Sequence, residues 1–210
     1  MNKKLENYIS DHTSEADMVL NELFRETHTK VLMPRMLSGH VQGKLLQFLS
    51  EMIKPQYILE IGTFTGYATI CLSKGLVSNG KIITIEINDE LEYMAAKYFI
   101  KAGIEPKTEQ IIGDALHIIP KLNFMFDLIF IDGDKREYPQ YFNLVLDKLK
   151  PGGFIIADNV LWNQKVLAPV EDNDLYTKGV VAFNTMVKNN PNVECVMLPL
   201  RDGLTLIKKN

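Results

Sequence analysis

The chain has 210 residues, of which 46% are hydrophobic and 23% charged, a composition typical of an ordinary globular protein of about one domain. Its formal net charge of −3 argues against a broad nucleic-acid-binding face, because phosphate contacts need clustered Lys and Arg side chains. Residues 1–17 are polar, and the longest apolar runs, such as Phe126–Ile131, are far too short to span a bilayer. We therefore expect a cytoplasmic protein that does not enter a membrane.

The first third of the chain is predicted to be helical. Apolar residues recur at helical spacing within residues 5–30, and another helix is expected from about His40 to Ile53. After Pro55, short apolar runs alternate with amphipathic stretches, which indicates βαβ units and a parallel sheet. The expected strands are Tyr57–Ile61, Lys81–Ile85, Glu109–Ile112, Leu128–Ile131 and Gly153–Ala157, and the expected helices lie near residues 67–76, 89–102, 115–121 and 138–149.

The C-terminal part has a different pattern. Residues 150–153 (Lys-Pro-Gly-Gly) predict a stop before a strand, and a helix is expected near 177–189. Two apolar runs follow, Val193–Leu198 and Leu204–Ile207, and the Asp-Gly link between them predicts an antiparallel hairpin. This order is similar to the Rossmann-like methyltransferase fold. We expect an α/β protein with a mostly parallel seven-stranded sheet, in one domain of residues 1–210 whose residues 1–54 form a helical extension and lid.

The two cysteines, Cys71 and Cys195, have no partner at CxxC or metal-ligand spacing. Free cysteines of this kind usually behave as small hydrophobic residues. We therefore predict that both are reduced and buried.

A glycine-containing loop follows the first predicted strand and precedes a helix, in the segment Glu60–Tyr67. Glu86 ends the second strand, a little over 20 residues later, where an acid can accept hydrogen bonds from ribose hydroxyls. A dinucleotide fingerprint would need glycine where this chain has Phe64, and Glu60 would repel a pyrophosphate. An acid at position 60 suits the cationic methionine end of S-adenosylmethionine instead. A tight strand–helix turn without any ligand is the alternative.

Two later strands end in acids, at Asp132 and at Asp158, and Asn159 follows the second. These three oxygen donors would converge at adjacent strand ends and leave open coordination positions, an arrangement that suits Mg²⁺. Acids at strand ends are also common as helix caps and turn formers. Lys135, three residues after the first acid, makes the pattern more specific.

These residues resemble the cation-dependent O-methyltransferases, the family that contains catechol and caffeoyl-CoA O-methyltransferases. The resemblance covers almost the whole chain from about Met36. The matching stretches are residues 36–39, 59–67, 85–86, 113–115, 131–135 and 158–163, of which the last two are the most specific.

The resemblance implies roles by position. Asp132, Asp158 and Asn159 correspond to metal ligands for Mg²⁺ or another divalent cation such as Mn²⁺ or Ca²⁺. Lys135 corresponds to the general base, with Asp132 also in the catalytic set. Trp162, Asn163 and Arg35 are the candidate acceptor contacts, with packing or surface roles as alternatives. The implied contacts to S-adenosylmethionine are Met36, Ser38, Glu60, Gly62, Thr63, Gly66, Ala68, Glu86, Asp114, Ala115, Asp132 and Asp134. Ala68 replaces a serine found in many relatives, and Thr69 is a candidate substitute.

The resulting hypothesis is a metal-dependent O-methyltransferase for a small catechol-like or other phenolic acceptor, and the family implies a homodimer. Within the same chemistry, the alternative substrate is tRNA carrying a hydroxylated wobble uridine, as for some bacterial members of the family. From other classes, the alternatives are a non-catalytic nucleotide-binding or scaffold protein, which the set Asp132, Lys135, Asp158 and Asn159 disfavours, and an NAD-dependent oxidoreductase, which Phe64 disfavours.

Overall fold

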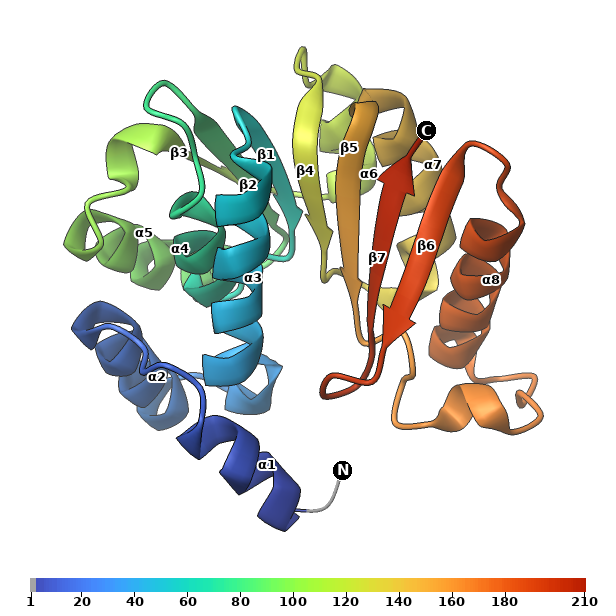
Figure 1. The fold of residues 1–210 in the computed structure, drawn as a ribbon, viewed down its shortest axis with the longest axis horizontal. Coiled ribbons are helices and arrows are strands. Elements are labelled where there is room, and N and C mark those ends of the chain that lie inside the picture. Colours follow the sequence, from blue (N-terminus) through green and yellow to red (C-terminus); the bar gives the residue numbers. More distant parts are fainter. Residues whose placement is uncertain (1–2) are drawn as a thin grey trace. The chain divides into compact units, whose positions relative to one another are not determined.

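The computed structural model describes residues 3–210 and contains a seven-stranded sheet of order β3-β2-β1-β4-β5-β7-β6 (Figure 1). The pairs β1–β4, β2–β3 and β4–β5 are parallel, whereas β5–β7 and β6–β7 are antiparallel. The expected α/β fold with a C-terminal antiparallel hairpin is therefore confirmed. The strands are β1 (Tyr57–Ile61), β2 (Lys81–Glu86), β3 (Thr108–Ile112), β4 (Phe126–Ile131), β5 (Leu149–Asp158), β6 (Val193–Leu198) and β7 (Leu204–Lys209).

Helices occupy most of the remaining chain, close to the predicted segments. They are α1 (Lys3–Asp11), α2 (Met18–Lys30), α3 (Gly39–Ile53), α4 (Tyr67–Ser73), α5 (Glu92–Lys101), α6 (Ala115–Ile118), α7 (Tyr138–Lys148) and α8 (Leu175–Asn189). The described residues form two compact units. The first runs up to Gln56 and from Thr63 to Gly113, and the second comprises Tyr57–Gly62 and Asp114–Asn210. The assignment of residues 1–210 to one domain stays a prediction.

In the first unit, helices α3 and α4 approach each other closely at Gly43. A Cβ atom at this position would lie 2.6 Å from a ring carbon of Tyr67 and 2.9 Å from Sγ of Cys71. All residues of α4 are buried. Glycine at position 43 therefore permits the packing that buries the helix directly following the Glu60–Gly66 loop.

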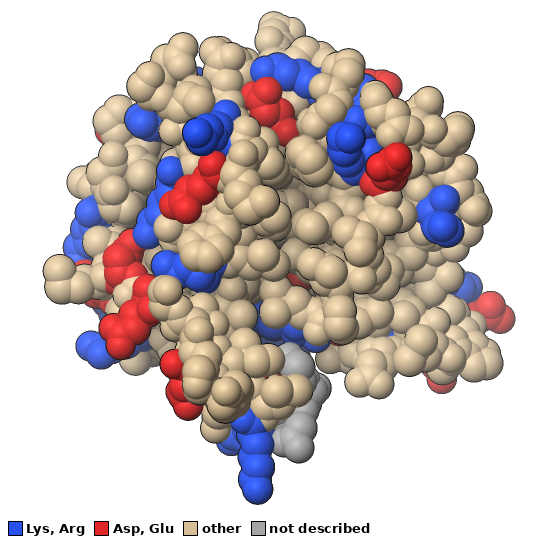
Figure 2. Space-filling model, in the orientation of Figure 1, with Lys and Arg blue, Asp and Glu red and all other residues tan. Residues whose placement is uncertain are grey.

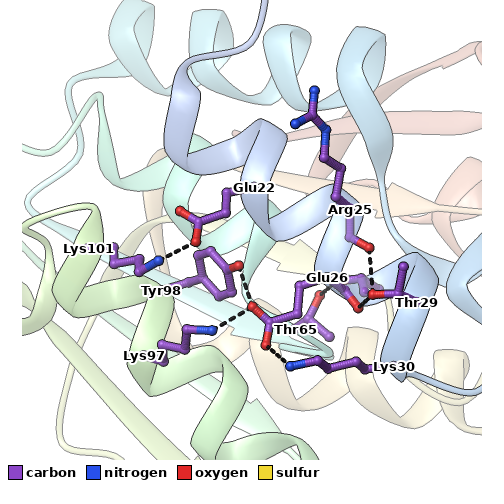
Figure 3. Close-up of polar contacts among 10 residues, drawn as sticks. Glu22, Arg25, Glu26, Thr29, Lys30, Thr65, Lys97, Tyr98 and Lys101 are labelled. Carbon is purple, nitrogen blue, oxygen red and sulfur yellow. Dashed lines mark hydrogen bonds and ion pairs between the residues drawn. The ribbon is translucent and has the colours of Figure 1, made fainter.

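Helix α2 is joined to α5 by a polar cluster centred on Glu26 (Figure 3). Its Oε2 accepts hydrogen bonds from Nζ of Lys97 at 2.5 Å and from the hydroxyl of Tyr98 at 2.6 Å, and its Oε1 accepts one from Nζ of Lys30 at 3.1 Å. Glu22 pairs in the same way with Lys101, one turn away on each helix. Hydrogen bonds from Lys97, Tyr98 and Lys30 lower the pKa of Glu26 to about 2.

Replacement of Glu26 with Gln is expected to lower the melting temperature near pH 7 by a few degrees, since 1 kcal/mol corresponds to roughly 2–4 °C in a chain of this size. The pKa of Glu26 is depressed from its ordinary 4.5, so its contribution is present above about pH 4.5 and is lost as pH falls toward 2. Melting curves of wild type and Glu26→Gln at several pH values check this. A difference that stays constant down to pH 2 would contradict it.

In the second unit, β4 and residues 155–158 of β5 are largely buried. Helices α7 and α8 pack on each other through aromatic rings. Phe183 of α8 makes edge-on contacts with Tyr138 and Phe142 of α7, at centroid distances of 5.3 and 5.9 Å. Gly179 of α8 also lies against the turn after β4, where a Cβ atom would be 2.2 Å from the carbonyl oxygen of Lys135. Helix α8 therefore supports the segment that carries Lys135.

Two expectations about this unit are wrong. Strand β5 begins at Leu149 and not at Gly153, because buried Leu149 pairs with Phe126 of β4 ahead of a register shift in the ladder. The Lys-Pro-Gly-Gly run therefore lies inside the strand rather than before it. Cys195 is exposed rather than buried, because it lies in β6 at the edge of the sheet, where most side chains are exposed; Cys71 is buried as expected, and both cysteines are free.

Charged side chains of both signs lie next to one another on the face drawn in Figure 2, which shows no broad basic area among the described residues. Within residues 3–210, no helix is long and apolar enough to cross a membrane.

Candidate functional site

The two predicted strand-end acids both lie in the second unit. Asp132 directly follows β4, and its backbone N–H donates to the carbonyl of Ile61 at 2.8 Å, while Asp158 is the last residue of β5. Gly62 has a φ of +100°, and a Cβ there would lie 2.3 Å from the carbonyl oxygen of Asp132. Only glycine lets the end of β1 lie this close to the end of β4.

Lys135 is buried beside the first acid. Its Nζ donates to Oδ1 of Asp132 at 2.8 Å, to the hydroxyl of Tyr138 at 2.8 Å and to the carbonyl of Gly133 at 3.2 Å. The side chain is 7% exposed, so the ammonium group depends on these partners rather than on water. The predicted catalytic pair, Asp132 and Lys135, is therefore brought into direct contact.

Burial raises the pKa of Asp132 to about 6, against the opposing effect of Lys135, and the charge of Asp158 adds to the rise. The two acids lie at neighbouring strand ends, because Ile131 and Ala157, the residues directly before them, are paired in the β4–β5 ladder. Oδ1 of Asp158 also accepts a hydrogen bond from the N–H of Asn159 at 2.8 Å, and Asn159 is held in a left-handed conformation with φ of 56°. The carboxylate of Asp158 is buried and that of Asp132 is half-buried, so their repulsion is poorly screened by water, and a bound cation would relieve it.

The donor set at these strand ends fits a hard divalent cation. Asp132 and Asp158 supply carboxylate oxygens and Asn159 an amide oxygen, which are the ligand types that Mg²⁺ and Ca²⁺ prefer. Residues 3–210 contain no cluster of three or more His, Cys, Asp or Glu side chains suited to a metal, so a site here depends on the amide as its third protein ligand.

The loop after β5 carries two of the three candidate acceptor contacts, Trp162 and Asn163. Trp162 stacks on Tyr176 at a centroid distance of 5.9 Å, and the guanidinium group of Arg136 lies 5.0 Å from the centre of the Tyr176 ring. The N–H of Asn163 donates to Oδ1 of Asp202 at 2.6 Å. Trp162 and Asn163 both have positive φ values, so this loop is conformationally strained and held by contacts from the β6–β7 turn.

In the first unit, the carboxylate of Glu86 is oriented by three backbone amides. Oε2 accepts from the N–H of Phe64 at 2.7 Å, and Oε1 accepts from the N–H groups of Ile87 and Asn88, both at 3.0 Å. A carboxylate has about four acceptor positions, so capacity remains for a ligand hydroxyl. Glu86 is thus fixed at the end of β2 and tied to the loop after β1, as its predicted role requires.

The other predicted cofactor contacts of the first unit fall into two groups. Thr63 bonds to Thr84 through their hydroxyl oxygens at 2.5 Å, and Gly66 approaches Phe99 so closely that a Cβ would lie 2.6 Å from its ring. Ser38 is buried, as is Ala68 within α4. By contrast, Met36, a predicted cofactor contact, is exposed, and so is Arg35, a predicted acceptor contact.

The remaining predicted contacts lie in the second unit. Glu60 and Ala115 are buried, and Asp114 caps α6 by accepting from the N–H of Leu116 at 2.8 Å. Asp134 accepts from the N–H and the guanidinium group of Arg136, so its carboxylate is engaged within its own turn.

Sequence reasoning missed Tyr138. This tyrosine is fully buried at the start of α7; besides accepting from Lys135, its hydroxyl lies 2.9 Å from the carbonyl of Asp158. It therefore connects the predicted base to the strand that carries the second acid. The sequence feature that could have identified Tyr138 is its position three residues after Lys135, at the start of a predicted helix. Asp202 and Tyr176 were also missed, because their partners are distant in sequence.

Comparison with known proteins finds matches along nearly the whole chain. A family model described as O-methyltransferase matches residues 10–210. A protein from Niastella koreensis named catechol O-methyltransferase is 33% identical, and the alignment covers 97% of this chain and 96% of the relative. Caffeoyl-CoA O-methyltransferase 1 from Eucalyptus globulus is 35% identical over 80% of this chain and 72% of its own. The structure of the O-methyltransferase TomG from Streptomyces achromogenes, in complex with SAM, matches with a TM-score of 0.93 and 30% identity, covering 100% and 99% of the two chains.

Proposed function

Because the chain belongs to the O-methyltransferase family and is an S-adenosylmethionine-dependent O-methyltransferase, we propose that it methylates a hydroxyl group of a small phenolic acceptor with the help of a divalent cation. The observation that carries this proposal is the contact of buried Lys135 with Asp132, beside Asp158 at the end of the neighbouring strand. A scaffold protein would have no need to bury an ammonium group against a carboxylate, because removing both charges from water costs free energy.

The proposed metal ligands are Asp132, Asp158 and Asn159, and Mg²⁺ is the proposed metal, with Mn²⁺ and Ca²⁺ as alternatives. A bound cation lowers the pKa of a hydroxyl that coordinates it and so favours the oxyanion needed for methyl transfer. The short side chains of these ligands, each at or next to a strand end, hold the oxygen donors rigidly. They leave the other coordination positions to water and acceptor.

Lys135 is the proposed general base. A phenol loses its proton near pH ~10, so the site must assist ionisation at neutral pH. Nζ of Lys135 already has hydrogen-bonding partners on one side, at Asp132 and Tyr138, which fixes its direction. To act as the base, Lys135 would first release one ammonium proton to solvent. The lone pair of the neutral amine would then take the acceptor proton, while the tyrosine hydroxyl keeps the nitrogen in place.

Glu86 is proposed to bind the ribose hydroxyls of S-adenosylmethionine, whose sulfonium carries the methyl group to be transferred. Replacement of Glu86 with Gln is expected to weaken binding of S-adenosylhomocysteine by about 1.5–3 kcal/mol for each charge-assisted hydrogen bond lost. Gln keeps an acceptor oxygen for the backbone amide of Phe64, but its NH2 group cannot accept from the N–H groups of Ile87 and Asn88, so the stability of the variant must be measured as well. Titration calorimetry measures the affinity and thermal melting controls for the fold. An unchanged affinity would remove Glu86 from the cofactor site.

The proposed acceptor is a small phenol, in line with the printed names of relatives from bacteria and plants. Trp162, Asn163 and Arg35 stay the proposed acceptor contacts, and a homodimer stays the proposed assembly. The tRNA alternative is less favoured, because the formal net charge of −3 argues against a broad surface for phosphate contacts. A methyl-transfer assay with labelled cofactor decides between them. It compares catechols, hydroxycinnamoyl thioesters and hypomodified tRNA, each with Mg²⁺ and with a chelator.

A further inference from the structure

The loop that joins β1 to α4 holds an unfavourable backbone conformation. Phe64 has a φ of 50° and Gly66 a φ of 90°, and the N–H of Gly66 closes the turn onto the carbonyl of Thr63 at 2.9 Å. A bulky side chain such as Phe is uncommon in the left-handed region and persists there only when its surroundings hold it. The residues that stabilise this loop therefore determine how much of the time its backbone has the conformation that a ligand would bind.

Among the described residues of the first unit, three side chains from outside the loop bond to it: Thr84 to Thr63, Glu86 to Phe64 and Thr27 to Thr65. Glu86 accepts from the N–H of Phe64, as described above. On the next residue, Oγ1 of Thr65 accepts a hydrogen bond from Oγ1 of Thr27 at 3.0 Å, and both threonines are completely buried. Removal of one buried partner leaves the other unsatisfied, so this bond contributes more than an exposed one would.

Helix α2, which carries Thr27, is itself fixed at both ends. Asp17 caps its start through the N–H of Leu20 at 2.9 Å, and the same carboxylate pairs with Lys74 after α4 at 2.5 Å. Nearer its end, Glu26 joins the helix to Lys97 and Tyr98 of α5 (Figure 3). The helix therefore presents Thr27 from a fixed position, next in sequence to the residue that attaches it to α5.

We propose that Thr27 is a positioning residue for S-adenosylmethionine, holding the Thr63–Gly66 loop in its binding conformation through Thr65. This inference rests on the proposed role of that loop and of Glu86 in the cofactor site. Thr27 needs no contact with the cofactor. The apparent affinity for the cofactor is proportional to the fraction of molecules whose loop is in the binding conformation, so it falls when that fraction falls.

The experiment measures the dissociation constant of S-adenosylhomocysteine by calorimetry for the full chain and its variants. Thr27→Val keeps the shape but removes the donor, and should raise the dissociation constant about two- to tenfold, the effect of losing one neutral hydrogen bond. Thr27→Ser retains the hydroxyl and should restore the wild-type value. Thr29→Val is the matched control, because the hydroxyl of Thr29 bonds only to carbonyls of its own helix, at Arg25 and Glu26 (Figure 3).

A double-mutant cycle with Thr65→Val tests the direct bond. If the two threonines act through it, the double variant should bind no more weakly than either single variant. Thr65→Val also removes the same bond should Thr27→Val fail to fold. A lower melting temperature of Thr27→Val with an unchanged dissociation constant would overturn the inference while leaving the proposed function intact. Failure of the wild type to bind S-adenosylhomocysteine would overturn the inference together with the cofactor assignment.

Discussion

Replacement of Asp158 with Asn is expected to abolish metal-dependent methyl transfer while leaving the fold intact. The substitution removes one of two proposed carboxylate ligands, but the amide oxygen can still accept the hydrogen bond from the N–H of Asn159. Loss of the charge at position 158 should also lower the pKa of Asp132 from about 6, because Asp158 contributes to raising it. The metal-free variant should then be at least as stable as the metal-free wild type.

The pH dependence of the metal-free wild type provides a second readout. Since the folded-state pKa of Asp132 lies above its ordinary 3.8, ionised Asp132 opposes folding above about pH 6, and this cost is relieved as pH falls toward 4. The difference in melting temperature between wild type and Asp158→Asn should therefore shrink over that range.

Activity assays and melting curves of both proteins, with Mg²⁺ and with EDTA, measure these effects. Asp147→Asn, an exposed position of α7 in the same unit, is the matched control. If Asp158 has only a structural role, a different pattern is expected. Asp158→Ala would then lose a turn hydrogen bond and about 0.5–2 kcal/mol of stability, whereas Asp158→Asn would keep both. Full wild-type activity in EDTA, after confirmed removal of metal, would contradict the metal-dependent mechanism.

Replacement of Lys135 with Met should cut turnover by about 10²–10⁴-fold, the usual contribution of a positioned acid–base group. Met has a similar shape but cannot take a proton. The loss should become smaller across a series of phenols of increasing acidity, because a more acidic hydroxyl needs less help to ionise.

Single-turnover rates with acceptors of graded acidity measure this dependence, while calorimetry follows the binding of S-adenosylhomocysteine. Lys188→Met, at an exposed position of α8, controls for the loss of a positive charge in the same unit. An equal loss for every acceptor would show that Lys135 orients the substrate rather than removing its proton.

Much of the fold follows from local sequence patterns. The strand Tyr57–Ile61 and the pair Val193–Leu198 and Leu204–Lys209 lie where the apolar runs place them, with one end extended by two residues. In a parallel sheet, polar residues that follow such runs come to the same edge. For this reason the sequence alone was sufficient to predict that Asp132 and Asp158 lie at strand ends, whereas the contact of Lys135 with Asp132 was seen only in the structure.

Tertiary structure decided what depends on neighbours distant along the chain. Leu149 belongs to β5 because Phe126 pairs with it, and Cys195 is exposed because β6 lies at the sheet edge. The pairing of Thr27 with Thr65 joins residues 38 positions apart, and that of Asn163 with Asp202 joins residues 39 apart. The local pattern of apolar and polar residues predicts which side chains of a segment are buried and which are exposed. It carries no information about which polar group from elsewhere will meet a buried hydroxyl or amide, because only the packed chain brings the two together.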